Sequence, residues 1–117
     1  MQVEFYQNSR GDYPVKEFLR DDKLSDKDKK KVAKFLLRVE NENDDKLIRF
    51  FRSKNATPFK GWQNLYEFRP FPFRIFFSLY KNICWLLHII IKRNEGPTPL
   101  REIKKAALGR DEILKNK

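Results

Sequence analysis

Apart from Lys81, which lies in a predicted turn, four charged side chains and one histidine interrupt the most apolar stretch of the chain, between residues 65 and 92. They are Glu67, Arg69, Arg74, His88 and Lys92. A charged side chain on a strand of a small core is costly unless it is paired or functional. A guanidinium group is permanently charged and holds a phosphate through two hydrogen bonds, while carboxylate, imidazole and amine groups transfer protons. This combination of residue types indicates chemistry on a phosphate group.

The same side chains also have a purely structural interpretation. Glu67 and an arginine can form an ion pair on an open face of a sheet, and His88 can be a hydrogen-bonded core histidine, since structural ion pairs are common. In the functional interpretation, Arg74, Arg69 and Lys92 bind phosphate, and Lys92 can also act as a base. Glu67 acts as a base or orients an arginine, and His88 acts as an acid or a base. The residues alone leave both interpretations open.

The elements that must position these residues are three predicted strands. Runs rich in aromatic and β-branched residues span about 65–69, 73–80 and 83–91. The turn signals between them are Pro70-Phe71-Pro72 and Lys81-Asn82. Because side chains alternate between the faces of a strand, the five candidates can converge on one patch of an antiparallel meander. The last run is apolar on both faces, which is typical of a central strand.

Further elements are predicted before the meander. Residues 2–6 alternate polar and apolar side chains and predict a short strand at or near an edge of the sheet. Pro14 suits the first position of a helix that runs to about residue 22. Ser25 and Asp28 resemble a capping box for a second helix that runs to about residue 40. A third short helix is expected around residues 47–51.

The C-terminal segment predicts a final helix, with Thr98 as its N-cap and Pro99 at its first position. Leu100, Ile103 and Ala107 are expected to face the sheet. The complete order predicts a single α+β domain over residues 1–117, in which an antiparallel sheet packs against N-terminal helices and a C-terminal helix.

The composition indicates a polyanionic partner. The chain of 117 residues has a net charge of +10, and residues 59–117 hold 12 basic and 5 acidic residues, a net charge of +7. Such an excess favours nucleic acid or an acidic protein as partner. The candidate RNA-binding residues after the meander are Arg93, Arg101, Lys104 and Lys105.

Other classes of site and location are disfavoured. Cys84 is the only cysteine, so an intrachain disulfide is excluded and a reducing cytoplasm is expected. The sequence shows no signal peptide, and its longest apolar run is too short to span a bilayer. It has no zinc-type cluster and no glycine-rich phosphate loop. We therefore expect a cytoplasmic protein that uses no membrane, no metal and no cofactor.

Four motifs follow one another along the second half of the chain. They are Leu65-Tyr-Glu-Phe-Arg69, Phe73-Arg-Ile-Phe-Phe77, Leu86-Leu-His-Ile-Ile-Ile-Lys-Arg93, and Thr98-Pro99 followed by Glu102-Ile103, Ala106 and Arg110. In this order they resemble the motifs of the RelE/ParE toxin superfamily and, within it, of the phage-derived, HigB-like branch. The resemblance spans roughly residues 59–112. Arg93 stands where the family typically has a second lysine, and no tyrosine follows Tyr80 to match the C-terminal catalytic tyrosine of the family.

The resemblance implies a RelE-like fold and the toxin of a type II toxin–antitoxin system. Most members of the HigB-like branch are endoribonucleases that cleave mRNA on the translating ribosome. The implied partners are the mRNA and a HigA-like, helix-turn-helix antitoxin, held in a hetero-oligomer. Two alternatives remain: a ParE-like toxin directed at DNA gyrase, and a non-catalytic basic module that binds nucleic acid. Under the endoribonuclease hypothesis, Arg74→Ala is expected to abolish toxicity and to leave the fold intact.

Overall fold

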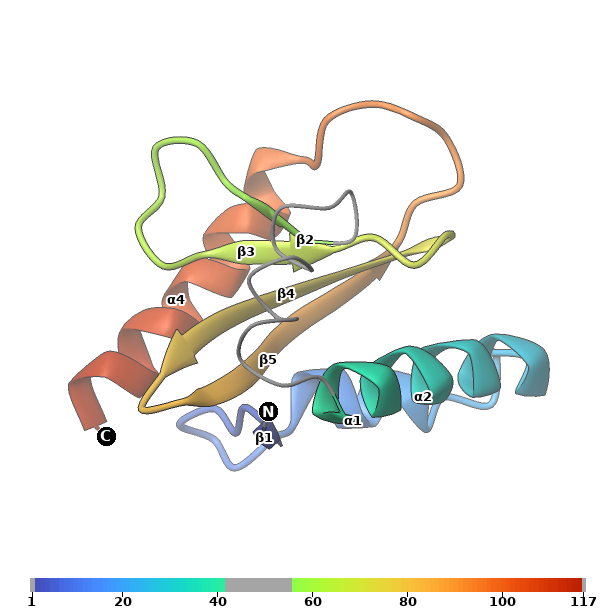
Figure 1. Cartoon of the computed structure of the whole chain (residues 1–117), viewed down its shortest axis with the longest axis horizontal. Helices are drawn as coiled ribbons and strands as arrows, with labels where there is room; N and C mark the ends of the chain where they lie inside the picture. The colour runs from blue at the N-terminus through green and yellow to red at the C-terminus, as the bar shows by residue number, and fades with distance from the viewer. Residues whose placement is uncertain (1, 42–55, 117) are drawn as a thin grey trace.

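A mixed five-stranded sheet runs through the molecule, with strand order β1-β5-β4-β3-β2 (Figure 1). The computed structural model describes residues 2–41 and 56–116, and over these residues the chain is an α+β domain with three helices. The strands are β1 (Gln2–Phe5), β2 (Ala56–Pro58), β3 (Tyr66–Phe68), β4 (Phe73–Tyr80) and β5 (Ile83–Ile91).

The predicted meander is confirmed. β3, β4 and β5 pair in sequence order and antiparallel, and β5 lies between β4 and β1, as expected of a central strand. Tyr80 pairs with Ile83 across a two-residue turn. Lys81 and Asn82 adopt φ angles of 52° and 63° there. A turn with two left-handed residues matches the twist of the strands that it joins, which explains the tight hairpin.

The expected antiparallel sheet is wrong at its first strand. β1 lies at an edge, as predicted, but it pairs parallel to β5, from Gln2 with Ile83 to Phe5 with Leu86. An alternating pattern indicates which face of a strand is buried, and it carries no information on strand direction. No short turn joins β1 to its neighbour, so no hairpin fixes an antiparallel direction.

One strand was not predicted. β2 pairs antiparallel to β3, with Ala56 opposite Phe68 and Pro58 opposite Tyr66, in a segment for which the sequence predicted no strand. A strand of three residues is too short to show alternation, and Pro58 is tolerated because an edge strand has one side without partners. The short helix expected around residues 47–51 lies outside the described residues.

The first two helices begin where the sequence predicts, whereas the last helix begins at Leu100, one residue after the predicted first position at Pro99. They are α1 (Pro14–Leu19), α2 (Asp26–Asn41) and α4 (Leu100–Asn116). Pro14 is at the first position of α1, and the N–H of Asp28 donates to Ser25 Oγ at 3.1 Å, which confirms the predicted cap of α2. Among residues 2–41 and 56–116, no helix has the length and apolar character needed to cross a bilayer.

Each face of the sheet has its own core. α1 and α2 pack on one face, over an entirely apolar cluster that includes Val32, Phe73 and Phe77, and α4 packs on the other (Figure 1). The α4 face also has an apolar cluster. The buried polar or charged side chains of the described part of the chain are Glu67, Arg74, Ser78 and Thr98.

α4 meets the sheet through alanine and isoleucine side chains. Ala107 is buried and Ile103 is partly buried against the α4-side core, as predicted. Leu100 is 55% exposed, so the prediction that it faces the sheet is wrong. It begins the helix, about one turn before the first residue that packs on the sheet.

Candidate anion-binding site

Three of the predicted cations line a single cavity at the end of the sheet. Arg69, Arg74 and Lys92 surround about 170 Å³ of space between the β3–β4 turn and the segment that follows β5. The N–H of Lys92 donates to the carbonyl oxygen of Pro72 at 2.7 Å, which joins the two segments. The remaining lining residues are Phe71, Pro72, Phe73, Asn94 and Glu95.

Arg74 is held rigidly beneath this cavity. It is 7% exposed. Its Nη1 donates to Thr98 Oγ1 at 2.6 Å, and its Nη2 donates to the carbonyl oxygen of Gly96 at 2.8 Å. Burial lowers the pKa of Arg74, and the nearby charge of Glu67 opposes that shift. Arg74 therefore ties β4 to the loop that leads into α4.

Glu67 completes the buried network and uses both of its carboxylate oxygens. Oε2 accepts from Thr98 Oγ1 at 2.8 Å, and Oε1 accepts from Nε of Arg69. Glu67 is 1% exposed, whereas the side chain of Arg69 is 44% exposed. This geometry favours Glu67 as the residue that orients Arg69, rather than as a base that reaches a substrate.

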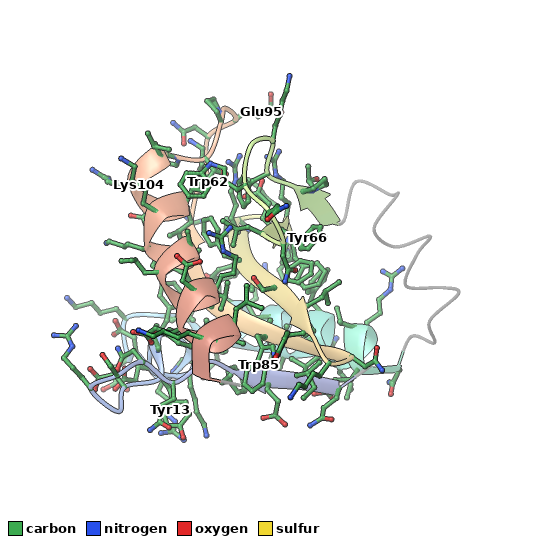
Figure 2. All side chains as sticks on the ribbon, turned by 90° about the vertical axis from the view of Figure 1, so that its left-hand side faces the viewer. Tyr13, Trp62, Tyr66, Trp85, Glu95 and Lys104 are labelled. Carbon is green, nitrogen blue, oxygen red and sulfur yellow. The ribbon has the colours of Figure 1, made fainter. Side chains whose placement is uncertain are left out.

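The loop after β5 brings one acidic side chain to the cavity. Lys92 is half-buried, and its Nζ lies 3.4 Å from Asn94 Oδ1. Glu95 is the acidic residue among those that line the cavity, so three cations and one carboxylate meet there. Figure 2 shows Glu95 on this loop, beyond the N-terminal end of α4. The net positive charge suits an anion, and Lys92 and Glu95 are the lining side chains that can exchange a proton.

His88 lies apart from the cavity, and a β-bulge in β5 sets its direction. Phe76 pairs with His88 and Phe77 with Leu86, so Leu87 is the extra residue. His88 therefore faces α4, where its Nε2 contacts a carboxylate oxygen of Glu102.

Glu102 is held in its charged form. Burial raises its pKa, but the hydrogen bond and charge of His88, with Lys105 and Arg101, outweigh burial and lower the pKa below its ordinary value of 4.5. His88 thus has a carboxylate partner, and its ring also lies against that of Phe76, with centroids 5.4 Å apart and an angle of 34° between the ring planes.

The predicted RNA-binding residues form a separate exposed group. Lys104 projects from α4 into solvent (Figure 2). Arg101 and Lys105 lie 3.6 and 3.8 Å from a carboxylate oxygen of Glu102. Arg93 reaches α2, where its Nη2 lies 4.0 Å from Asp28. Arg93 and Arg101 also line, together with Lys92, a neighbouring cavity of about 260 Å³.

Sequence reasoning missed the loop residues that complete the site. Thr98 was predicted as an N-cap, but its hydroxyl joins Arg74 and Glu67 instead. Gly96 contributes its carbonyl oxygen and adopts a φ of 136°, a conformation that favours glycine. Glu95 and Glu102 were not singled out as partners. A loop has no repeating pattern of apolar residues that would show which of its groups are buried. The Gly-Pro-Thr-Pro stretch indicates only that a loop is present at residues 96–99.

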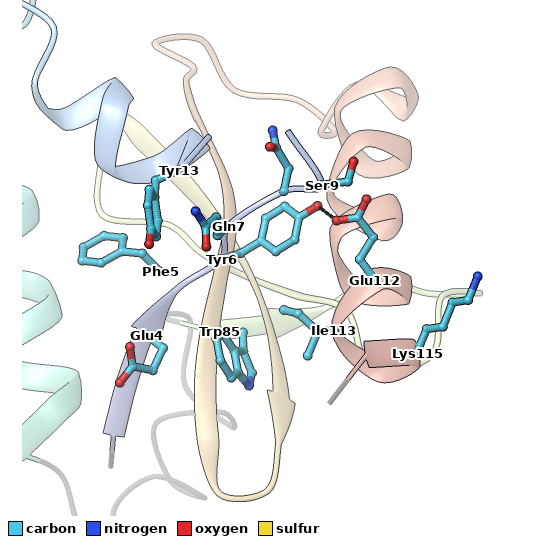
Figure 3. Close-up of a pocket in the computed structure, with 11 residues that line it drawn as sticks. Glu4, Phe5, Tyr6, Gln7, Ser9, Tyr13, Trp85, Glu112, Ile113 and Lys115 are labelled. Carbon is cyan, nitrogen blue, oxygen red and sulfur yellow. Dashed lines mark hydrogen bonds between the residues drawn. The ribbon is translucent and has the colours of Figure 1, made fainter. Parts of the chain in front are cut away.

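A larger cavity, also lined by described residues, has different chemistry. It encloses about 610 Å³ between α4 and the segment that follows β1 (Figure 3). There the Tyr6 hydroxyl donates to a carboxylate oxygen of Glu112, and burial and this carboxylate raise the pKa of Tyr6. Two carboxylates and one lysine line the cavity, and none of the predicted site residues does. The candidate site is therefore the smaller, cation-lined cavity.

Comparison with family models and with curated proteins gave no match to this sequence. In residues 2–41 and 56–116, no three His, Cys, Asp or Glu side chains lie close enough together to hold a metal ion.

Proposed function

We propose that the protein is the toxin of a type II toxin–antitoxin system and that it cleaves mRNA on the ribosome. The observation that carries this proposal is the convergence of Arg69, Arg74 and Lys92 at one cavity. The order of the motifs along the chain, which resembles that of HigB-like members of the RelE/ParE superfamily, supports the same function.

The proposed reaction is transesterification of an RNA phosphodiester. The 2′-hydroxyl loses its proton and its oxygen bonds to phosphorus, while the bond from phosphorus to the 5′ oxygen breaks and that oxygen takes up a proton. The products are a 2′,3′-cyclic phosphate and a 5′-hydroxyl end. Catalysis requires cations that stabilise the added charge on the phosphorane, and groups that move the two protons.

Each predicted residue takes a role that its surroundings allow. Arg69, half exposed and held by Glu67, binds the scissile phosphate, and Lys92 supplies a second cation. Glu67 and Arg74 position the site from below, because both are buried and bonded within the protein. Lys92 and Glu95 are the proton-transfer candidates within the cavity, whereas His88 lies apart from it and contacts Glu102.

A non-catalytic nucleic-acid-binding module is the second candidate, and one observation favours it. Glu67 and Arg74, two of the five predicted catalytic residues, have their polar atoms engaged inside the protein. A binding module needs a positive surface and no group that transfers protons.

Induced expression with mapping of transcript ends separates these functions. Wild-type protein should produce new 5′-hydroxyl ends inside translated frames. Lys92→Ala should lower cleavage about 100-fold, as expected when one transition-state donor is lost. The matched control, Lys60→Ala, removes an exposed lysine outside the cavity and should cut as the wild type does. Intact transcripts with broken DNA would point to gyrase, and unimpaired growth with intact transcripts would point to a binding module.

The proposed inhibitory partner is a HigA-like antitoxin that contains a helix-turn-helix domain. Acidic and apolar groups on that partner would match the basic surface around the cavity, since charge complementarity raises association rates and apolar contacts supply affinity. Co-expression should restore growth and give a complex that co-purifies. Harmless expression of the wild-type protein alone would contradict the toxin assignment.

A further inference from the structure

α2 carries a row of lysines that the proposed active site does not use. Lys27, Lys31 and Lys34 are spaced by four and three residues, so they lie along one side of the helix. All three are exposed, whereas Val32 and Val39 on the opposite side are buried. The row extends over about 10 Å of helix. Lys27 lies in the first turn of α2, where a cation opposes the helix dipole, and the like charges of Lys27 and Lys31 repel each other at a spacing of four residues.

An exposed aromatic ring connects this row to the cavity. Phe71 is 62% exposed, and Nζ of Lys31 lies 5.7 Å from the centroid of its ring. The same ring lines the cavity of Arg69, Arg74 and Lys92. Phe71 is the aromatic residue among the large hydrophobic side chains that are exposed in the described part of the chain. The packing of the core does not require a phenylalanine in this position.

We propose that single-stranded RNA follows a track from the lysine row of α2, over Phe71, into the cation-lined cavity. The lysines contact successive phosphates, and a base stacks on Phe71. Single-stranded nucleic acids are bound by such a combination of a basic groove and aromatic platforms. The inference rests on the proposed function for the role of the cavity and extends it to the surface that feeds the cavity.

RNA matches the whole surface better than an acidic protein does. Lysine and arginine side chains attract any polyanion, but an exposed, flat ring between two groups of cations suits an alternation of phosphates and bases. Asp28 on α2 is near the track and is paired with Arg93, and Glu95 is the acidic residue at the cavity. Residues 26–34 of α2 hold five lysines against two aspartates, Asp26 and Asp28, so this part of the helix has a net charge of +3.

Binding of a short RNA tests the track without requiring cleavage. The probe is a 2′-O-methyl oligonucleotide of about 12 nucleotides, a length within the usual site sizes, with a fluorescein end label and one internal 2-aminopurine. The double variant Lys31→Glu/Lys34→Glu is compared with Lys60→Glu/Lys115→Glu, which changes the net charge equally at exposed positions elsewhere. The melting temperature of each variant shows that it is folded.

The variants on the track should bind RNA much more weakly. At about 100 mM salt each lost phosphate contact removes a factor of about five, so the α2 double variant should bind roughly 25-fold more weakly. Its plot of log affinity against log salt should be shallower by about 1.4. Phe71→Ala should weaken binding about 5- to 100-fold and abolish quenching of 2-aminopurine, whereas Phe71→Trp should retain both.

Several results would overturn the track. Equal losses in the two double variants would mean that net charge alone matters. Wild-type affinity and quenching in Phe71→Ala would remove the stacking platform. If a co-expressed acidic protein co-purifies with the wild type but not with the α2 double variant, and RNA binding is unchanged, the surface binds that protein and not RNA. If the wild type cuts transcripts while the α2 variant binds RNA normally, only the track fails. RNA binding along the track without cleavage would instead reject only the proposed function.

Discussion

The two faces of the sheet bury different kinds of side chain. On the α1 and α2 face, Phe68 and Phe77 stack with ring centroids 3.9 Å apart, and the surrounding buried side chains are apolar. On the α4 face, an apolar cluster lies beside a buried network of Glu67, Arg74 and Thr98. One side of the sheet thus contains buried charges and the other does not.

This difference indicates that the apolar face stabilises the fold, whereas the buried polar network holds the residues of the cavity in position. The first face demonstrates that these strands can be covered by apolar side chains alone, so burial of charge is not needed to close the fold. Buried ion pairs are weak evidence for stability because both charges lose their hydration. On the α4 face the network fixes Arg69 and the loop of residues 92–98, and these are the segments that form the cavity.

The apolar face should show the largest loss of stability. Phe77→Ala removes a fully buried ring that stacks between Phe68 and Tyr66. We expect the free energy of unfolding in urea to fall by about 3–5 kcal/mol, the range for a buried phenylalanine truncated to alanine. A loss below about 1 kcal/mol would mean that this face is not the main source of stability.

Substitution of Arg74 should lower stability less than Phe77→Ala does, and its main effect should be a loss of RNA cleavage. Arg74→Ala breaks two hydrogen bonds of a buried cation, so we expect a loss of about 1.5–3 kcal/mol. The burial of Arg74 thus changes the sequence-based expectation of an unaffected fold. Arg74→Met keeps the volume and separates packing from charge. If both variants melt as the wild type does, the network does not hold the loop.

The contact between His88 and Glu102 should show the smallest effect, and one that depends on pH. A carboxylate with a lowered pKa in the folded state stabilises the protein above its unfolded pKa, and the stabilisation disappears as the pH falls through the folded value. Glu102→Gln should therefore cost about 1 kcal/mol at pH 7, and the two unfolding curves should converge below pH 4.5. A difference that persists there would reject the charged contact.

The long strands could be predicted because their sequence is locally unambiguous. Apolar runs with turn residues at both ends define β4 and β5, and Asn82 supports the left-handed turn between them. β2 could not be predicted, since a strand of three residues shows no alternation. The parallel direction of β1 depends on contacts far away in sequence, which a local pattern does not contain.

The candidate site likewise has parts that the sequence predicts and parts that it does not. Alternation along strands, together with the Pro-Phe-Pro turn, predicts that Arg69, Arg74 and Lys92 approach one another, and the structure brings them to one cavity. The partners in the loop, Gly96 and Thr98, could not be predicted because their roles depend on where the loop folds back. The separation of His88 from the cavity depends on α4, which supplies its partner Glu102.

The parallel pairing of β1 with β5 has a consequence for the order of events during synthesis. Phe5 pairs with Leu86, so the first strand waits for about 80 further residues before its partner exists. At about 5–20 residues per second, this wait lasts roughly 4–16 s. The loop that Arg74 binds comes later still, at Gly96 and Thr98. The network that holds Arg74 and Glu67 is therefore incomplete in every nascent chain that lacks Thr98, so the site takes its final geometry only after residue 98 has been synthesised.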